Sequence, residues 1–172
     1  MALIRTSHLI ILFLTALVVR LLWVPRWSLL QFEGHEAAYL RAFQGSEVGA
    51  STASYPALTA LYGVLGSVTS DPRALVIFSA LIGALGVVGF AIWVSRGTSS
   101  RAGVLAGTMA CLLPEHVLWS TSAYNVIVPN TLLIWALALR GYPAFVLCLM
   151  AGSVRVETLL VAPFTGIRGA LG

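Results

Sequence analysis

The sequence has no lysine and few charged residues of any kind. Ten arginines and six acidic residues make up 9% of the 172 residues and give a formal net charge of +4. Soluble globular domains carry about 25% charged residues, and disordered chains combine high charge with low hydrophobicity, so both classes are excluded. The arginines are scattered singly, so the chain lacks the basic cluster of a nucleic-acid-binding protein. With 59% hydrophobic residues, it is expected to be an integral membrane protein.

Cysteine is also scarce. Cys111 and Cys148 are the only two, and both lie in apolar runs. This pattern gives no support for a disulfide framework or a zinc site, and it is typical of small buried side chains. The chain also lacks a phosphate-binding P-loop, a Rossmann glycine turn, a Gly-x-Ser-x-Gly turn and a His-Glu-x-x-His motif. The enzyme classes that these motifs mark therefore have no support.

Several apolar runs approach the length of about 20 residues that a membrane-crossing helix needs. One uncharged apolar run, residues 74–95, lies between Arg73 and Arg96. The sequence therefore predicts an all-α fold, a multi-pass transmembrane helix bundle that residues 1–172 form as a single domain. About five spans are expected, over residues 8–24, 74–95, 102–119, 126–139 and 143–164. Glycines within two of them predict close helix packing: Gly83, Gly86, Gly89, Gly103 and Gly107.

The largest polar region, residues 27–73, is expected to be an outer loop with two helices along the membrane surface. Residues 35–44 contain strong helix formers and end before Gly45, which favours a helix stop there. Residues 56–68 are apolar but too short to cross easily, which suits an interfacial or re-entrant helix. A crossing there would swap the sides of all later loops. With the N-terminus inside, most of the acids gather outside: Glu33, Glu36, Glu47 and Asp71.

Charged side chains within or beside membrane spans are costly, so each is a candidate for function. Arg20 lies near the outer end of the first span, where it either extends to the lipid headgroups or contacts a phosphate. Glu33, His35 and Glu36 lie at the start of the first loop helix. A partly desolvated carboxylate there could act as a general base. The alternative is a solvated loop end, where the helix dipole alone favours Glu36.

Polar residues also mark the later spans. Glu115 and His116 end the third span, and Asn125 and Asn130 interrupt the start of the fourth. Both groups either face the same outer surface as the loop acids or are simply interfacial.

Two charges, Arg155 and Glu157, fall inside the fifth expected span. Residues two apart on a helix point in different directions, so these side chains are not expected to pair with each other. Each is therefore expected to need a partner elsewhere in the bundle or on a further polypeptide.

Short motifs follow one another along the chain: Arg20-Leu-Leu-Trp23, His35-Glu36-x-x-Tyr39, Tyr55-Pro56, and Pro114 with Ser120. In this order they resemble the N-terminal module of the GT-C membrane glycosyltransferases. The pattern is most similar to lipid A aminoarabinose transferases and protein O-mannosyltransferases. Complete members of that family are longer, so the resemblance makes this chain either their N-terminal module or a short relative.

The resemblance implies roles for particular residues. In that family an Asp-Glu-x-x-Tyr stretch opens the first outer loop, and its acid is the catalytic base. Glu36 and Tyr39 match this stretch, while His35 occupies the usual Asp position and Glu33 lies close enough to substitute. A second family acid precedes a proline after the third span, and Val128 replaces it here.

The implied reaction is an inverting sugar transfer from a polyprenyl-phosphate donor. Glu36 would deprotonate the acceptor hydroxyl, and positive groups or a divalent cation would stabilise the departing phosphate. Arg20 and Arg155 would contact that phosphate, and no metal ligand is assigned. The other candidates for substrate binding are Tyr39, Tyr55, Glu115, His116, Asn125, Asn130 and Glu157.

The expected partners are the lipid bilayer and the lipid-linked sugar, with the active face outward from a plasma (inner) membrane. A rival interpretation is a non-catalytic membrane subunit that keeps the bundle without the chemistry. His35 and Val128 at the usual acid positions favour the rival, whereas Glu36, Arg20 and Arg155 favour the enzyme. A transporter or channel half would carry more charge at mid-membrane depth than this chain does.

Overall fold

Every regular element that the structure describes is a helix. The computed structural model describes residues 4–27, 35–46, 56–121, 126–139 and 141–161. The helices are α1 (Thr6–Trp27), α2 (His35–Phe43), α3 (Pro56–Val68), α4 (Arg73–Gly97), α5 (Ser100–Leu112), α6 (Pro114–Ser120), α7 (Ile127–Ala138), α8 (Tyr142–Val154) and the 3-10 helix η2 (Val156–Val161). The expected all-α class is therefore confirmed for these residues, which contain no strand.

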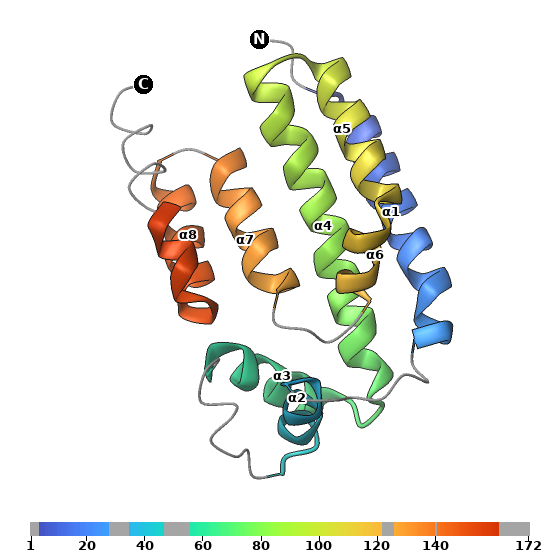
Figure 1. The fold of residues 1–172 in the computed structure, drawn as a ribbon, viewed down its shortest axis with the longest axis vertical. Coiled ribbons are helices and arrows are strands. Elements are labelled where there is room, and N and C mark those ends of the chain that lie inside the picture. The colour runs from blue at the N-terminus through green and yellow to red at the C-terminus, as the bar shows by residue number, and fades with distance from the viewer. Residues whose placement is uncertain (1–3, 28–34, 47–55, 122–125, 140, 162–172) are drawn as a thin grey trace.

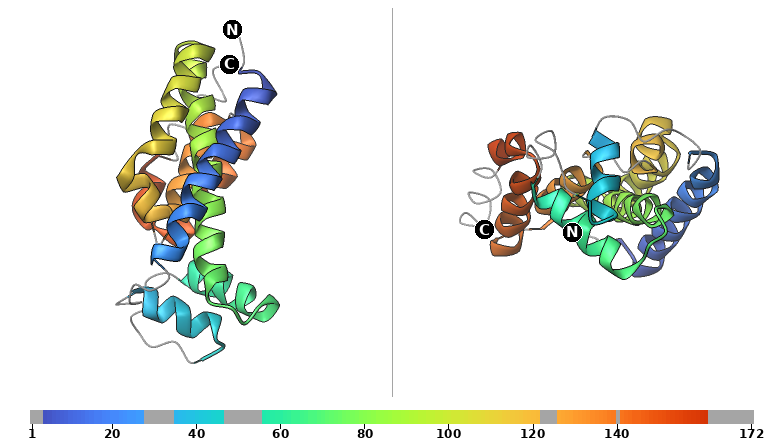
Figure 2. Two further views of the ribbon diagram at one scale, coloured as in Figure 1. Left: turned by 90° about the vertical axis from the view of Figure 1, so that its right-hand side faces the viewer. Right: turned by 90° about the horizontal axis from the view of Figure 1, so that it is seen from below.

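The long helix α4 is the centre of the bundle. It packs against α1, α5 and α7, and α8 packs against α7. Figures 1 and 2 show α1 and α8 on opposite sides of α4. The helices α2 and α3 lie across the end of the bundle at which α1 ends and α4 begins (Figure 1). The start of α1 and the turn between α4 and α5 lie at the other end.

Among the described residues, two helices are long and apolar enough to cross a membrane: α1 over Thr6–Val24 and α4 over Arg73–Gly97. A third span results if α5 and α6, which are bent by 65° at the break between them, act together. The chain is thus compatible with a membrane protein, and five spans stay a prediction because α7 and α8 are shorter. The expected span over residues 143–164 is not one helix, because α8 ends at Val154 and η2 follows.

Small residues let α4 pack closely on its neighbours, as the sequence predicts. A Cβ atom on Gly86 would lie 2.8 Å from Thr131 Oγ1 of α7. A Cβ atom on Gly103 of α5 would lie 2.6 Å from the backbone oxygen of Ala91. The close approach also lets Thr131 Oγ1 donate a hydrogen bond across the interface to the backbone oxygen of Ile82 at 3.2 Å. Both features are typical of helix association in membranes.

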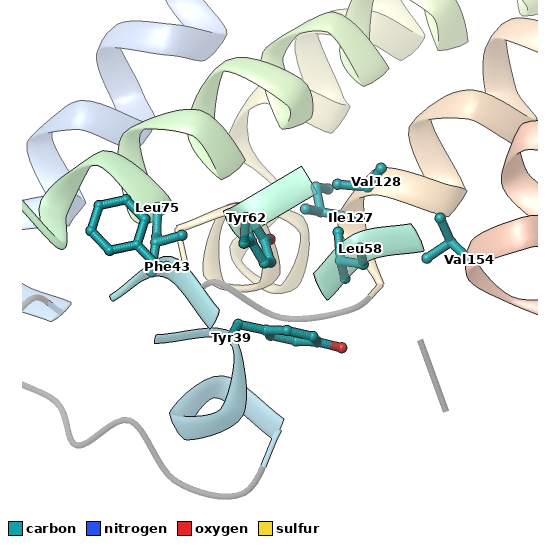
Figure 3. Packing of buried hydrophobic residues seen from close by; sticks show 8 residues of the cluster. All are labelled: Tyr39, Phe43, Leu58, Tyr62, Leu75, Ile127, Val128 and Val154. Carbon is teal, nitrogen blue, oxygen red and sulfur yellow. The ribbon is translucent and has the colours of Figure 1, made fainter. Parts of the chain in front are cut away.

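The helices α2 and α3 form a pair that closes one end of the bundle. Gly45, with φ of 69°, follows the end of α2 as the sequence predicts. The two helices cross at Gly66, where a Cβ atom would overlap the carbonyl group of Phe43. Helix α2, which is expected to lie along the membrane surface, is therefore covered by protein at Phe43, which is 4% exposed. We call the buried residues at this end of the bundle the end cluster (Figure 3): Tyr39, Phe43, Leu58, Tyr62, Leu75, Ile127, Val128 and Val154.

Candidate functional site

Among the residues that the structure describes, one charged side chain is completely buried within the bundle. Arg20, toward the end of α1, has 0% exposed surface. Its Nη1 donates a hydrogen bond to the backbone oxygen of Ala16 at 2.8 Å. Its Nη2 lies 2.6 Å from Nδ1 of His116 on α6. The structure therefore brings together two of the predicted site residues, which lie 96 positions apart in the sequence.

The short helix α6 reaches Arg20 because the chain breaks after α5. Pro114 begins α6 at a position where its missing N–H costs nothing, and the 65° bend directs His116 toward α1. Ser120, at the end of α6, packs against Gly83 of α4. A Cβ atom on Gly83 would overlap the Ser120 side chain and lie 3.0 Å from Arg20 Nε. The helices α1, α4 and α6 thus enclose the guanidinium group.

The charge of Arg20 has no acidic partner among the described residues. The one ion pair in that part of the chain joins Arg155 and Glu157, and Arg20 Nε has no acceptor there. An arginine at the centre of a membrane helix costs about 2.5–3.5 kcal/mol on insertion scales. A bound anion would compensate this charge. The Arg20–His116 pair is therefore the strongest candidate for a functional site, as an anion-binding centre.

The expectation that Arg155 and Glu157 cannot pair is wrong. Because α8 ends at Val154 and Arg155 is extended, Arg155 Nε and Nη2 donate to Glu157 Oε1 at 3.1 and 2.8 Å. The chain folds back here because Gly152 leaves space for the side chain of Leu159, which lies where a Cβ atom would be. Both ionic side chains are partly exposed, so neither needs a partner from another helix. Helix α8, after which they follow, lies on the opposite side of the bundle from α1 (Figure 1).

The other described candidates lie in three different settings. Tyr39 is fully buried in the end cluster, with its ring centroid 5.1 Å from that of Tyr62, which is typical of core packing. Glu115 is exposed in the first turn of α6, and Asn130 is exposed on α7. Both cysteines are buried, as predicted. Within the described ranges, no three His, Cys, Asp or Glu residues form a group that could hold a metal ion.

The predicted catalytic residues cannot be compared with the geometry around Arg20. Glu33, Tyr55 and Asn125 lie outside the described residues. His35 and Glu36 begin α2, but their side chains are outside what the structure describes. The roles of these residues, and of a divalent cation held by the loop carboxylates, stay predictions.

Sequence reasoning did not predict that Arg20 and His116 form a pair. A signal was available, because both lie at the outer ends of expected spans that run in the same direction, and hence at a similar depth. The sequence also marks Gly83 only as a packing glycine and Ser120 only as part of a motif. Their contact beside Arg20 depends on the bend before Pro114, which no local pattern predicts.

Comparisons with protein-family models, with curated proteins and with solved structures found no match to this chain. The case for a function therefore rests on the residues around Arg20 and on the motifs of the sequence.

Proposed function

We propose that the chain is a membrane glycosyltransferase of the GT-C type, or the N-terminal module of one. It transfers a sugar from a polyprenyl-phosphate donor to an acceptor on the outer face of the plasma membrane. The observation that carries this proposal is the buried, uncompensated charge of Arg20 in an apolar bundle. A lipid phosphate suits this place because its charge would offset the guanidinium while its apolar chain stays in the bilayer.

Glu36 is the base in the proposed mechanism. It removes the proton from the acceptor hydroxyl, whose oxygen then attacks the anomeric carbon from the face opposite the phosphate. The bond between that carbon and the phosphate oxygen breaks, and the phosphate leaves with the electron pair. Positive charge from Arg20 stabilises the leaving group. Helix α2, which carries Glu36, lies across the end of the bundle at which α1 ends, and Arg20 is toward that end of α1. This arrangement supports the division of roles.

The environment of Val128 favours a second candidate function. Val128 stands where the family carries its second acid, and it is 7% exposed in the end cluster (Figure 3). A residue packed in this way takes no part in proton transfer or metal binding. The alternative is therefore a non-catalytic integral membrane subunit. It would keep the bundle and the lipid-phosphate site, and it would act together with a further polypeptide.

Transfer is tested with the purified chain in liposomes that contain radiolabelled polyprenyl-phosphate sugars and candidate acceptors. Glu36→Gln should lower turnover about 100-fold or more, as expected for the loss of a general base. The matched variant Glu33→Gln should have little effect, and neither should shift the thermal midpoint. Loss of activity with Glu33→Gln alone would assign the base to Glu33. Donor binding without any transfer would favour the non-catalytic subunit.

A further inference from the structure

The hydrogen bond to Arg20 determines the protonation of the His116 ring. Arginine can only donate, so the Nδ1 atom of His116, 2.6 Å from Arg20 Nη2, is the acceptor. The proton of the neutral imidazole is then on Nε2. A proton on Nδ1 would place two donors and two positive charges against each other. His116 therefore offers one N–H donor, at Nε2, which has no partner among the described residues.

Access to the two side chains differs. Arg20 is fully buried: Gly83 and Ser120 lie beside its Nε, and the backbone oxygen of Ala16 occupies its Nη1. His116 is only half-buried. A ligand that approaches this part of the bundle therefore meets the imidazole before the guanidinium.

We propose that His116, and not Arg20, is the residue that contacts the phosphate. The Nε2–H group of His116 donates a hydrogen bond to a phosphate oxygen. Arg20 is a positioning residue behind it, which fixes the tautomer through Nδ1 and supplies positive charge across the ring. Such an outer partner commonly sets the orientation and tautomer of a histidine that binds a ligand through its other nitrogen. This inference rests on the proposed binding of a lipid phosphate and assigns its contact residue.

The first test needs no ligand. Histidine labelled with 15N is incorporated into the full chain in lipid nanodiscs, and His116→Asn and His8→Asn assign the ring signals. Wild-type His116 should show an unprotonated Nδ1 and a protonated Nε2. Arg20→Met should shift these signals toward the mixed tautomers of a free imidazole. A protonated Nδ1 in the wild-type protein would overturn the inference.

The second test measures binding of undecaprenyl phosphate in the same nanodiscs, with undecaprenol and inorganic phosphate as comparison probes. The lipid phosphate should shift the Nε2 signal of His116, and undecaprenol should not. His116→Asn keeps an acceptor for Arg20 but loses the Nε2 donor. It should weaken binding about 10- to 100-fold, the range for a hydrogen bond to a charged group. His8→Asn, at the exposed start of α1, should bind as the wild type does.

Each failure has a distinct meaning. If undecaprenyl phosphate binds and His116→Asn binds it equally well, His116 is not the contact residue, while the proposed function stands. If the wild-type chain does not bind undecaprenyl phosphate, both the proposed function and the inference are rejected. Equal binding of inorganic phosphate would assign the site to a free anion and overturn the lipid headgroup as its ligand.

Discussion

Replacing Arg20 with methionine is expected to destabilise the ligand-free protein by less than the loss of one partner of a buried ion pair would, and to remove its anion site. Methionine is long and flexible enough to fill most of the space, so no large cavity forms. The charge that is removed costs about 2.5–3.5 kcal/mol in a membrane helix. The two hydrogen bonds that are lost, to Ala16 and His116, have a charged donor and are worth about 1.5–3 kcal/mol each. Taken together, these ranges run from a stabilisation of about 0.5 kcal/mol to a destabilisation of about 3.5 kcal/mol.

The assay is equilibrium unfolding of the purified chain in mixed detergent micelles. Arg5→Met is the matched control, because Arg5 is exposed and the same chemical change should alter the free energy of unfolding by less than about 0.5 kcal/mol. Binding of undecaprenyl phosphate to Arg20→Met should fall to background. A destabilisation of more than about 4 kcal/mol would refute the reasoning, because it exceeds this range and lies within the loss of about 3–5 kcal/mol expected when one partner of a compensated buried ion pair is removed.

Four further substitutions test the packing and one ion pair by the same unfolding assay. Gly66→Ala should destabilise by about 1–3 kcal/mol because its Cβ atom would overlap a backbone carbonyl of α2. Gly63→Ala should be neutral or stabilise by up to about 1 kcal/mol, because its Cβ atom would lie 3.7 Å from the nearest backbone oxygen. Equal effects of Gly63→Ala and Gly66→Ala would contradict the crossing of α2 and α3 at Gly66. Thr131→Val removes the hydrogen bond to α4, so it should lower the free energy of unfolding by about 0.6 kcal/mol. An unchanged midpoint would argue against that hydrogen bond. Glu157→Gln should leave the midpoint unchanged because its ion pair is exposed, whereas a large loss would indicate a buried role.

The helices could be predicted because their signals are local. The apolar run between Arg73 and Arg96 becomes α4, and Pro56 begins α3 as expected. Gly45 has the positive φ that a helix stop commonly uses. The packing glycines of α4 could be predicted for the same reason, since a small residue is the requirement for close approach whatever helix lies opposite.

The prediction for the last helix failed because a contact between Gly152 and Leu159 ends that helix, and the apolar pattern does not show this contact. A continuous helix would separate Arg155 from Glu157, but Gly152 leaves a space that Leu159 fills, and the chain turns back instead. A run of poor helix formers, Gly152 to Val154, was the available signal. Since the two charges pair with each other, they give no reason to expect a further polypeptide.

For the candidate site, the sequence could nominate single residues but not their geometry. Arg20 and His116 were identifiable because charged and polar groups beside apolar runs are rare. Their pairing depends on the 65° bend before α6 and on the absence of a side chain at Gly83. Both are tertiary conditions, and neither changes the apolar pattern from which spans are predicted.

The arrangement of α2 and α3 predicts which loops share a side of the membrane. Ser46 follows α2 and Ser70 follows α3, and these two helices cover one end of the bundle (Figure 1). Thr98 follows the 25-residue helix α4, which ends at the other end of the bundle. A helix of that length rises about 37 Å, enough to cross a bilayer core. Single cysteines at these three positions, in a chain with Cys111→Ala and Cys148→Ala, are therefore expected to divide into two groups.

Cysteines introduced as Ser46→Cys and Ser70→Cys should both react with an impermeant thiol reagent added to intact cells. Thr98→Cys should react only after permeabilisation, because α4 carries it to the inner side. The chain with no cysteine is the control for background labelling. If Ser46→Cys reacts from outside and Ser70→Cys does not, α3 crosses the membrane. The packing of α2 on α3 would then be incompatible with the protein in its bilayer, because Gly66, near the end of α3, would lie on the inner side while Phe43 stays outside with Ser46.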